Sequence, residues 1–189
     1  MAKQFPSITP KHDAFIRRQH VFFTASAAAS GRVNVSPRET GALRILDPNA
    51  VCYLDQTGSG SETAAHLLAD GRLTLMFCAF EGPPLILRLY GRGESIVRGT
   101  QAYAHLLAEH YGGLEPLGAR QIVRLAIDLV QTSCGFGVPL FDYKAERDNL
   151  HRWAAARGDD GLRAYQREKN AFSMDGLPTG LVTEDEAAE

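Results

Sequence analysis

Apolar residues change their spacing twice along the chain, and the changes predict one helix, then a set of strands, then more helices. The first helix begins at Thr9-Pro10, where Thr9 caps the helix and Pro10 fits its first turn, with Phe15 and Ile16 on its apolar face. The following apolar runs are short, rich in β-branched and aromatic residues, and separated by Gly, Pro, Ser and Asn, which favours strands. The six predicted strands cover residues 21–27, 32–36, 42–46, 51–55, 72–80 and 85–97.

After Gly99 the apolar residues recur at helical spacing. Helices are predicted over residues 100–111, 118–133, 144–158 and 161–172, while 134–143 is too rich in Gly and Pro to be regular. One further helix is expected between the fourth and fifth strands. The predicted fold class is therefore mainly β with α elaboration: an antiparallel barrel or sandwich of about six strands, followed by C-terminal helices. Residues 1–99 form the barrel core, residues 100–189 pack on the same domain, and the acidic end beyond Val182 is expected to be mobile.

Length and charge exclude several classes of protein. A chain of 189 residues suits one domain, and its formal net charge of −2 gives no broad attraction to nucleic acid or anionic lipid. No apolar run reaches the roughly 18 residues of a membrane span, so we expect a cytoplasmic protein. The three cysteines are far apart, and His105 and His110 lack metal-pair spacing, so we expect no metal site.

The sequence "YLDQTGSGSETAAHL" leads from a strand through a Gly-rich turn into a helix. Ser59 and Glu62 have the spacing of a capping box, and free amides at a helix start stabilise an anion. The turn matches neither a Walker loop nor GxGxxG, and it contains no Lys or Arg. It is either a plain turn with a capped helix or a phosphate site whose cations come from other segments. The candidate cations are Arg32, Arg38, Arg72 and Arg88.

Three segments, "FFTASAAASGRVNVSPRE", "VCYLDQTGSGSETAAHLLADGRLTLMFCAFEGPPLILRLYGRG" and "SCGFGVPLFDY", resemble the pyridoxamine 5′-phosphate oxidase-like family, and within it a subgroup of short bacterial members. The resemblance covers about residues 15–99 and implies an FMN-binding split β-barrel that forms a homodimer with FMN at the interface. It also implies which residues contact FMN. Carried onto this sequence, the cofactor-binding residues would be Arg32, Asn34, Val35, Ser36, Arg38, Leu54, Asp55, Thr57, Gly58, Ser59 and Arg88.

Three departures from the family pattern argue against oxidation of vitamin B6. True pyridoxamine-phosphate oxidases follow the Gly-Ser of this turn with Arg-Lys, where this chain has Gly60 and Ser61. Their Arg-Gln pair before the strand-ending glycine is replaced by Leu85-Ile86, and their closing Trp and Arg-Leu signature is missing from "SMDGLPTGLVTEDEAAE". Arg32 and Arg38 would then carry more of the phosphate binding.

The resemblance predicts an FMN-dependent oxidoreductase that acts on an unidentified small molecule, in which the flavin carries the electrons. No residue can be assigned as a catalytic acid or base from the sequence. Cys134 is either a redox thiol or a small residue in a packed turn. The alternative function is a non-catalytic carrier of flavin, haem or a deazaflavin in the same barrel, and a third is a dimeric interaction module with an empty groove.

Overall fold

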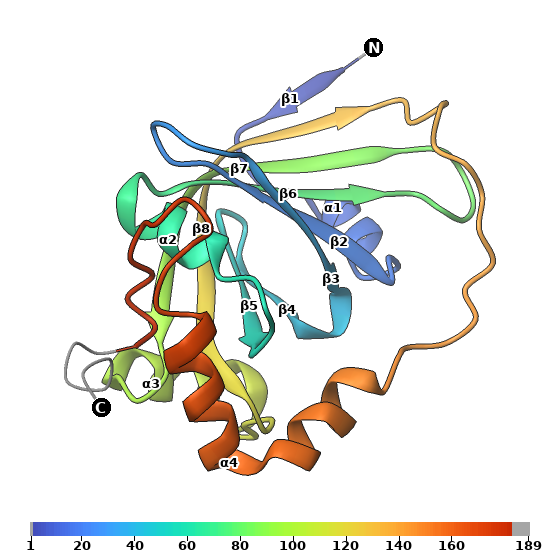
Figure 1. Cartoon of the computed structure of the whole chain (residues 1–189). Helices are drawn as coiled ribbons and strands as arrows, with labels where there is room; N and C mark the ends of the chain where they lie inside the picture. The colour runs from blue at the N-terminus through green and yellow to red at the C-terminus, as the bar shows by residue number, and fades with distance from the viewer. Residues whose placement is uncertain (1, 183–189) are drawn as a thin grey trace.

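Within residues 2–182, which this computed structural model describes, eight strands form one antiparallel sheet that curls into a split barrel (Figure 1). The sheet order is β3-β2-β6-β7-β8-β5-β4, and β1 pairs with the far end of β8. The strands are β1 (Lys3–Phe5), β2 (Val21–Ser26), β3 (Asn34–Glu39), β4 (Leu43–Asp47), β5 (Ala50–Gln56), β6 (Arg72–Cys78), β7 (Ile86–Val97) and β8 (Ala119–Ser133).

Helices cover the ends and flanks of this sheet (Figure 1). They are α1 (Pro10–Ile16), a short 3-10 helix η1 (Thr40–Ala42), α2 (Glu62–Ala69), α3 (Gln101–Tyr111) and α4 (Asn149–Lys169). Thr9 caps α1 as expected, and its hydroxyl accepts a hydrogen bond from the His12 amide. The helix α4 is kinked at Gly158, where φ is +67°, so the two predicted C-terminal helices are confirmed as two arms of one element.

The fold class is confirmed, since the six predicted strands correspond to β2–β7 and the helices pack around them. The main core lies on one face of the sheet and is built from Phe22, Tyr53, Phe77, Leu89 and their neighbours. A smaller core fills the space between α3 and the sheet and includes Cys52, Leu54, Tyr103 and Ile122. Because β5 lies between the two cores, alternate residues of this strand are buried on opposite faces.

The prediction of a helix over residues 118–133 is wrong, because this segment is the 15-residue strand β8. Its first five residues are all buried, as expected of a strand covered on both faces, so they show no alternation. Alternation begins only at Arg124, and Ile122, Leu125 and Leu129 happen to share helical spacing. The strand β8 pairs with β7 and β5, so residues after Gly99 complete the sheet begun before it.

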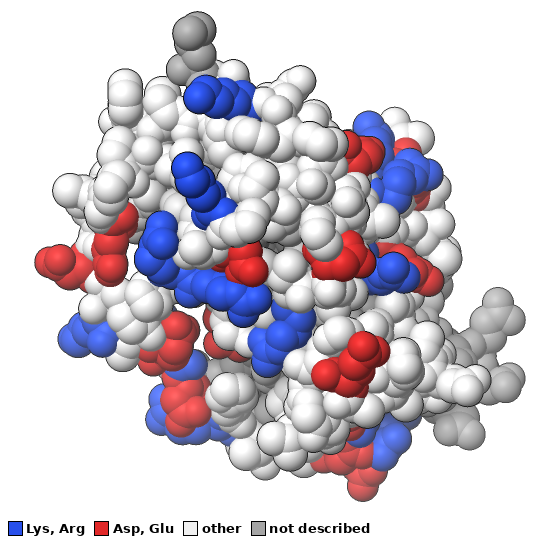
Figure 2. Space-filling model, turned by 180° about the vertical axis from the view of Figure 1, so that it is seen from behind, with Lys and Arg blue, Asp and Glu red and all other residues white. Residues whose placement is uncertain are grey.

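Acidic and basic side chains are interspersed on the face shown in Figure 2, in keeping with the formal net charge of −2. Among residues 2–182, no helix combines the length and the apolar character needed to cross a lipid bilayer. The mobile end expected beyond Val182 lies outside the described residues.

Replacing Gly91 with alanine should lower the free energy of unfolding by at least about 2 kcal/mol, because of overpacking against backbone. A β-carbon at Gly91 would lie 1.9 Å from the Ala126 carbonyl oxygen, at the bulge where β7 shifts register against β8. Urea unfolding measures the effect. Gly41→Ala is the matched control, since a β-carbon there meets nothing within 4 Å. Equal stability of the two variants would contradict the observed packing of β7 on β8.

Candidate functional site

A cavity of about 240 Å³ opens where β5 turns into α2, at residues 57–61 of the sequence. Side chains from β3 form one wall of this cavity, and the start of β8 forms another. We call it the turn cavity. Its lining residues are Asn34, Ser36, Pro37, Arg38, Gln56, Thr57, Gly58, Ser59, Gly60, Ser61, Glu62, Thr63, Ala64, Arg120, Gln121 and Leu150.

The backbone amides of the turn are available to a ligand. Among the described residues, the amides of Gly58, Ser59 and Gly60 make no hydrogen bond. The predicted capping box is wrong: the N-cap is Ser61, its side chain makes no capping bond, and the Glu62 carboxylate accepts from the Ser61 amide at 3.1 Å. The box fails because α2 begins two residues later than the spacing of Ser59 and Glu62 requires. The first-turn amides of α2 therefore remain oriented toward an acceptor outside the helix.

Residues from the start of β8 and from the end of α4 hold this turn in place. Asn170 donates to the Gly58 carbonyl at 3.0 Å, and Arg120 donates to the Gly60 carbonyl at 2.7 Å. Gln166 donates to the Thr57 hydroxyl at 2.6 Å, and that hydroxyl donates to the Gly118 carbonyl at 2.7 Å. Because the carbonyls of Gly58 and Gly60 are bonded to protein groups, the turn keeps its shape while its amides stay free.

A buried ion cluster lies beneath the turn and centres on Asp55, which is 1% exposed. Its Oδ1 accepts from Arg38 at 2.5 Å, and its Oδ2 accepts from Arg120 Nε and Gln121 Nε2, each at 2.8 Å. Burial by itself would raise the pKa of Asp55, but Arg120, Arg38 and the Gln121 hydrogen bond together lower it below its ordinary value. Asp55 is therefore a carboxylate that positions two guanidinium groups.

Arg38 connects this ion cluster to the turn cavity. Its Nη1 is bonded to Asp55, and its guanidinium lies 5.7 Å from the centre of the Tyr53 ring. Its Nε is buried and has no hydrogen-bond partner among the described residues. An unpaired donor of this kind costs free energy unless an acceptor reaches it, so Arg38 has capacity for a ligand.

On the opposite wall, β3 alternates between side chains that face the cavity and side chains that face solvent. Asn34 donates to the Thr63 hydroxyl at 3.0 Å, and Ser36 donates to the Asn34 side-chain oxygen at 3.1 Å. Val35, between them, points the other way and is 61% exposed. The wall facing the turn is therefore polar.

The structure brings together six of the residues that the family resemblance assigns to FMN. Asn34, Ser36, Arg38, Thr57, Gly58 and Ser59 all line the turn cavity, and Asp55 lies buried beneath it. The remaining four lie elsewhere in this single chain: Arg32 pairs with Asp175, Val35 faces solvent, Leu54 is in the smaller core, and Arg88 donates to Ser133 at 3.3 Å. Their contact with a cofactor stays a prediction.

Arg120, Gln121 and Asn170 were not identified from the sequence. The sequence did contain one signal, the polar pair Arg120-Gln121 at the start of an apolar segment. Because that segment was predicted to be a helix, the pair was not placed beside the turn. Cys134 is exposed and forms no disulfide. Among residues 2–182, no group of three or more His, Cys, Asp or Glu side chains has the arrangement of a metal site.

Comparisons with known proteins support one family. The family model for pyridoxamine 5′-phosphate oxidase matches residues 8–134. A pyridoxamine 5′-phosphate oxidase family protein of Aspergillus flavus, ustO, is 40% identical over 177 residues, which are 85% of this chain and 71% of that protein.

Solved structures show the same fold at low sequence identity. A HupZ variant from Group A Streptococcus has a TM-score of 0.54 and 20% identity, covering 67% of this chain and 99% of that one. A candidate pyridoxamine 5′-phosphate oxidase from Lactobacillus delbrueckii has a TM-score of 0.51 and 19% identity, covering 67% and 94%. By its family model, its curated relative and its fold, the chain belongs to the pyridoxamine 5′-phosphate oxidase family.

Proposed function

We propose that this chain binds FMN with the phosphate in the turn cavity and acts as a flavin-dependent oxidoreductase on a small molecule. One observation carries the proposal: the backbone amides of Gly58–Gly60 make no hydrogen bond among the described residues, and they lie on the same cavity as Arg38, whose buried Nε has no partner there either. Amides at a helix start and a guanidinium are the donors that phosphate groups use in proteins. The hydroxyls of Ser59 and Thr63 add further donors on the same cavity.

The charges around the turn fit a phosphate held mainly by hydrogen bonds. Arg38 and Arg120 share the single carboxylate of Asp55, which leaves one positive charge in the ion cluster. Glu62 offsets that charge, although its carboxylate already accepts from the amides of Ser61 and Met174, each at 3.1 Å. We therefore expect weaker phosphate binding than in relatives that place Arg-Lys at positions 60 and 61.

The turn cavity of one chain is too small to enclose a whole flavin. Its volume of about 240 Å³ is below the roughly 300 Å³ at which ordinary ligand pockets begin. Large apolar side chains are exposed on the segment between β8 and α4, including Phe136 at 82% and Leu140 at 72%. We propose that a second copy of the chain covers these side chains and completes the flavin site in a homodimer.

In such a site, the residues of this chain would bind FMN and orient it. FMN supplies the electron-transfer chemistry when bound. Arg38 and the turn amides fix the phosphate, and Asp55 with Arg120 keeps Arg38 and the Gly60 carbonyl in position. The carboxylate of Glu62 lines the turn cavity but already accepts from two backbone amides, so no catalytic proton donor is assigned.

Comparing FMN with riboflavin tests the phosphate assignment directly. If the turn holds the phosphate, FMN should bind at least about tenfold more tightly than riboflavin, because charge-assisted hydrogen bonds are lost without it. Fluorescence quenching of each flavin measures both affinities, and light scattering during gel filtration measures the oligomeric state. Equal affinity for the two flavins would contradict the phosphate site, and a monomer that binds FMN fully would contradict the shared interface.

A second function, a carrier without turnover, is favoured by the Gly60 and Ser61 that replace Arg-Lys at the turn. Such a carrier would hold flavin, haem or a deazaflavin in the same barrel. Adding NADH or NADPH anaerobically to the FMN-loaded protein separates the two functions. Bleaching of the flavin absorbance supports an oxidoreductase, whereas a spectrum unchanged by either donor supports the carrier.

A further inference from the structure

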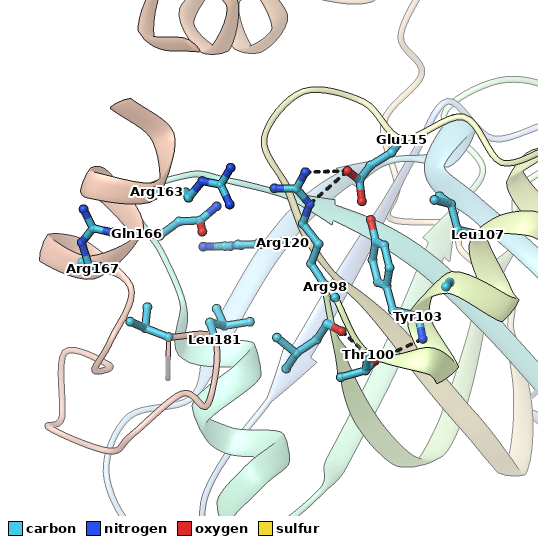
Figure 3. A pocket seen from close by; sticks show the side chains of 14 residues that line it. Arg98, Thr100, Tyr103, Leu107, Glu115, Arg120, Arg163, Gln166, Arg167 and Leu181 are labelled. Atoms are coloured by element: carbon cyan, nitrogen blue, oxygen red, sulfur yellow. Dashed lines mark hydrogen bonds and ion pairs between the residues drawn. The ribbon is translucent and has the colours of Figure 1, made fainter. Parts of the chain in front are cut away.

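A second, larger cavity of about 630 Å³ lies between the end of β7, helix α3 and the C-terminal arm of α4 (Figure 3). We call it the arginine cavity. It shares Arg120 with the turn cavity, and another of its lining residues, Gln166, donates to the Thr57 hydroxyl of the turn. Figure 3 shows Arg163 and Gln166 projecting from α4 toward Arg120, with Arg98 and Tyr103 on the facing side.

The charges in the arginine cavity are unequal. Arg98 contacts Glu115 at 2.7 Å and Asp159 at 3.4 Å, and Arg163 pairs with the same Asp159. Arg167 has no ion pair or hydrogen bond among the described residues. Three guanidinium groups therefore have two carboxylates as partners, and of these two only Glu115 lines the cavity. Arg120 does not change this balance, because Asp55 compensates it in the ion cluster.

The two arginines of α4 are like charges at neighbouring positions on the helix surface. Arg163 and Arg167 are four residues apart on one helix, a spacing at which like charges lower helix stability. Both line the cavity, so an anion between them would relieve the repulsion and accept hydrogen bonds from both. One unbalanced positive charge suits a monoanion better than a dianion.

The rest of the lining is mostly apolar. Val97, Ala104, Leu107 and Leu181 are among the lining residues, so part of the cavity wall is aliphatic. The Tyr103 hydroxyl lies on the side facing α4, next to the Glu115 carboxylate. A cavity with a few convergent polar groups and apolar walls is the usual form of a small-molecule site.

We propose that the arginine cavity binds a small monocarboxylic acid, with its carboxylate between Arg163 and Arg167 and its aliphatic body against the apolar part of the lining. This site is distinct from the turn cavity, and the proposal does not depend on FMN. A carboxylate accepts two parallel hydrogen bonds from a guanidinium, which gives the cavity a geometric preference for that head group.

Titration calorimetry with octanoate, acetate and 1-octanol tests the proposal on the full chain. Octanoate should bind. Acetate lacks the aliphatic chain and 1-octanol lacks the negative charge, so each should bind at least about tenfold more weakly than octanoate. The double variant Arg163→Gln with Arg167→Gln should weaken octanoate binding at least about tenfold. Arg152→Gln, an exposed arginine on the other arm of α4, is the matched control and should bind octanoate as the wild type does.

Octanoate binding that is unchanged in the double variant would overturn the proposal, and so would 1-octanol binding as tightly as octanoate or no octanoate binding at millimolar concentration. FMN affinity is measured on the same variants and should stay at its wild-type value, because neither arginine lines the turn cavity. Loss of octanoate binding with FMN binding intact therefore tests the arginine cavity alone.

Discussion

Replacing Asp55 with alanine should lower the free energy of unfolding by about 3–5 kcal/mol, the cost of removing one partner from a buried ion pair. Asp55 is 1% exposed and accepts hydrogen bonds from Arg38, Arg120 and Gln121. Without it, two guanidinium groups lie close together with no carboxylate between them, and Arg120 is itself almost fully buried. Urea unfolding at pH 7, followed by circular dichroism, measures the loss.

The control for this variant is Asp128→Ala, an exposed aspartate on β8, which should change stability by less than about 0.5 kcal/mol. The pH dependence adds a second check. Because the folded state lowers the pKa of Asp55, its contribution is fully present above the unfolded pKa of about 3.9 and is lost as pH falls through the folded pKa. The gap between wild type and Asp55→Ala should therefore narrow below about pH 4. A gap independent of pH would contradict an ionised Asp55.

Replacing Ser59 with aspartate should weaken FMN binding about a hundredfold, which corresponds to about 2.7 kcal/mol of binding free energy. Ser59 is exposed on the turn, beside amides that have no acceptor. A carboxylate there would compete for those amides and repel the phosphate, while the charge favours the start of α2 and leaves the fold intact. Fluorescence titration measures the FMN affinity.

Riboflavin, which has no phosphate, should bind the Ser59→Asp variant nearly as well as it binds the wild type. Ser30→Asp, at an exposed serine in the loop between β2 and β3, controls for the added charge and should leave FMN affinity within about threefold. If riboflavin and FMN lose affinity equally, the turn acts on the flavin ring and not on the phosphate. Unchanged FMN affinity would place the phosphate outside the turn cavity.

The strands that could be predicted from the sequence are those with clear boundaries. Gly, Pro, Ser and Asn separate β2–β7, so their positions follow from local pattern alone. The strand β8 lacks this signal because α3 covers one face of its first half and the main core covers the other. Burial on both faces depends on residues far along the chain, and no local pattern reports it.

Only part of the candidate site could be predicted from the sequence, because the rest depends on contacts between residues far apart in the chain. The family resemblance assigned Asn34, Ser36 and the turn to the cofactor, and these residues do share one cavity. It assigned Arg32 to the phosphate as well, but that side chain pairs with Asp175 in this structure. The partners that hold the turn, Arg120 and Asn170, lie 60 and 112 residues from the carbonyls that they bind. Contacts over such separations follow from the tertiary fold only.

The place of β8 in the sheet has a consequence for how the protein is made. Strands β3, β2, β6 and β7 form one continuous set and β4 with β5 another, and within residues 2–182 only β8 joins them. On the ribosome, both sets emerge before β8 does, and each then has an edge strand whose backbone N–H and C=O groups are unpaired. The barrel cannot close until residue 133 has been synthesised, so nascent chains pass through a stage in which chaperones and early edge-to-edge pairing compete for the same backbone.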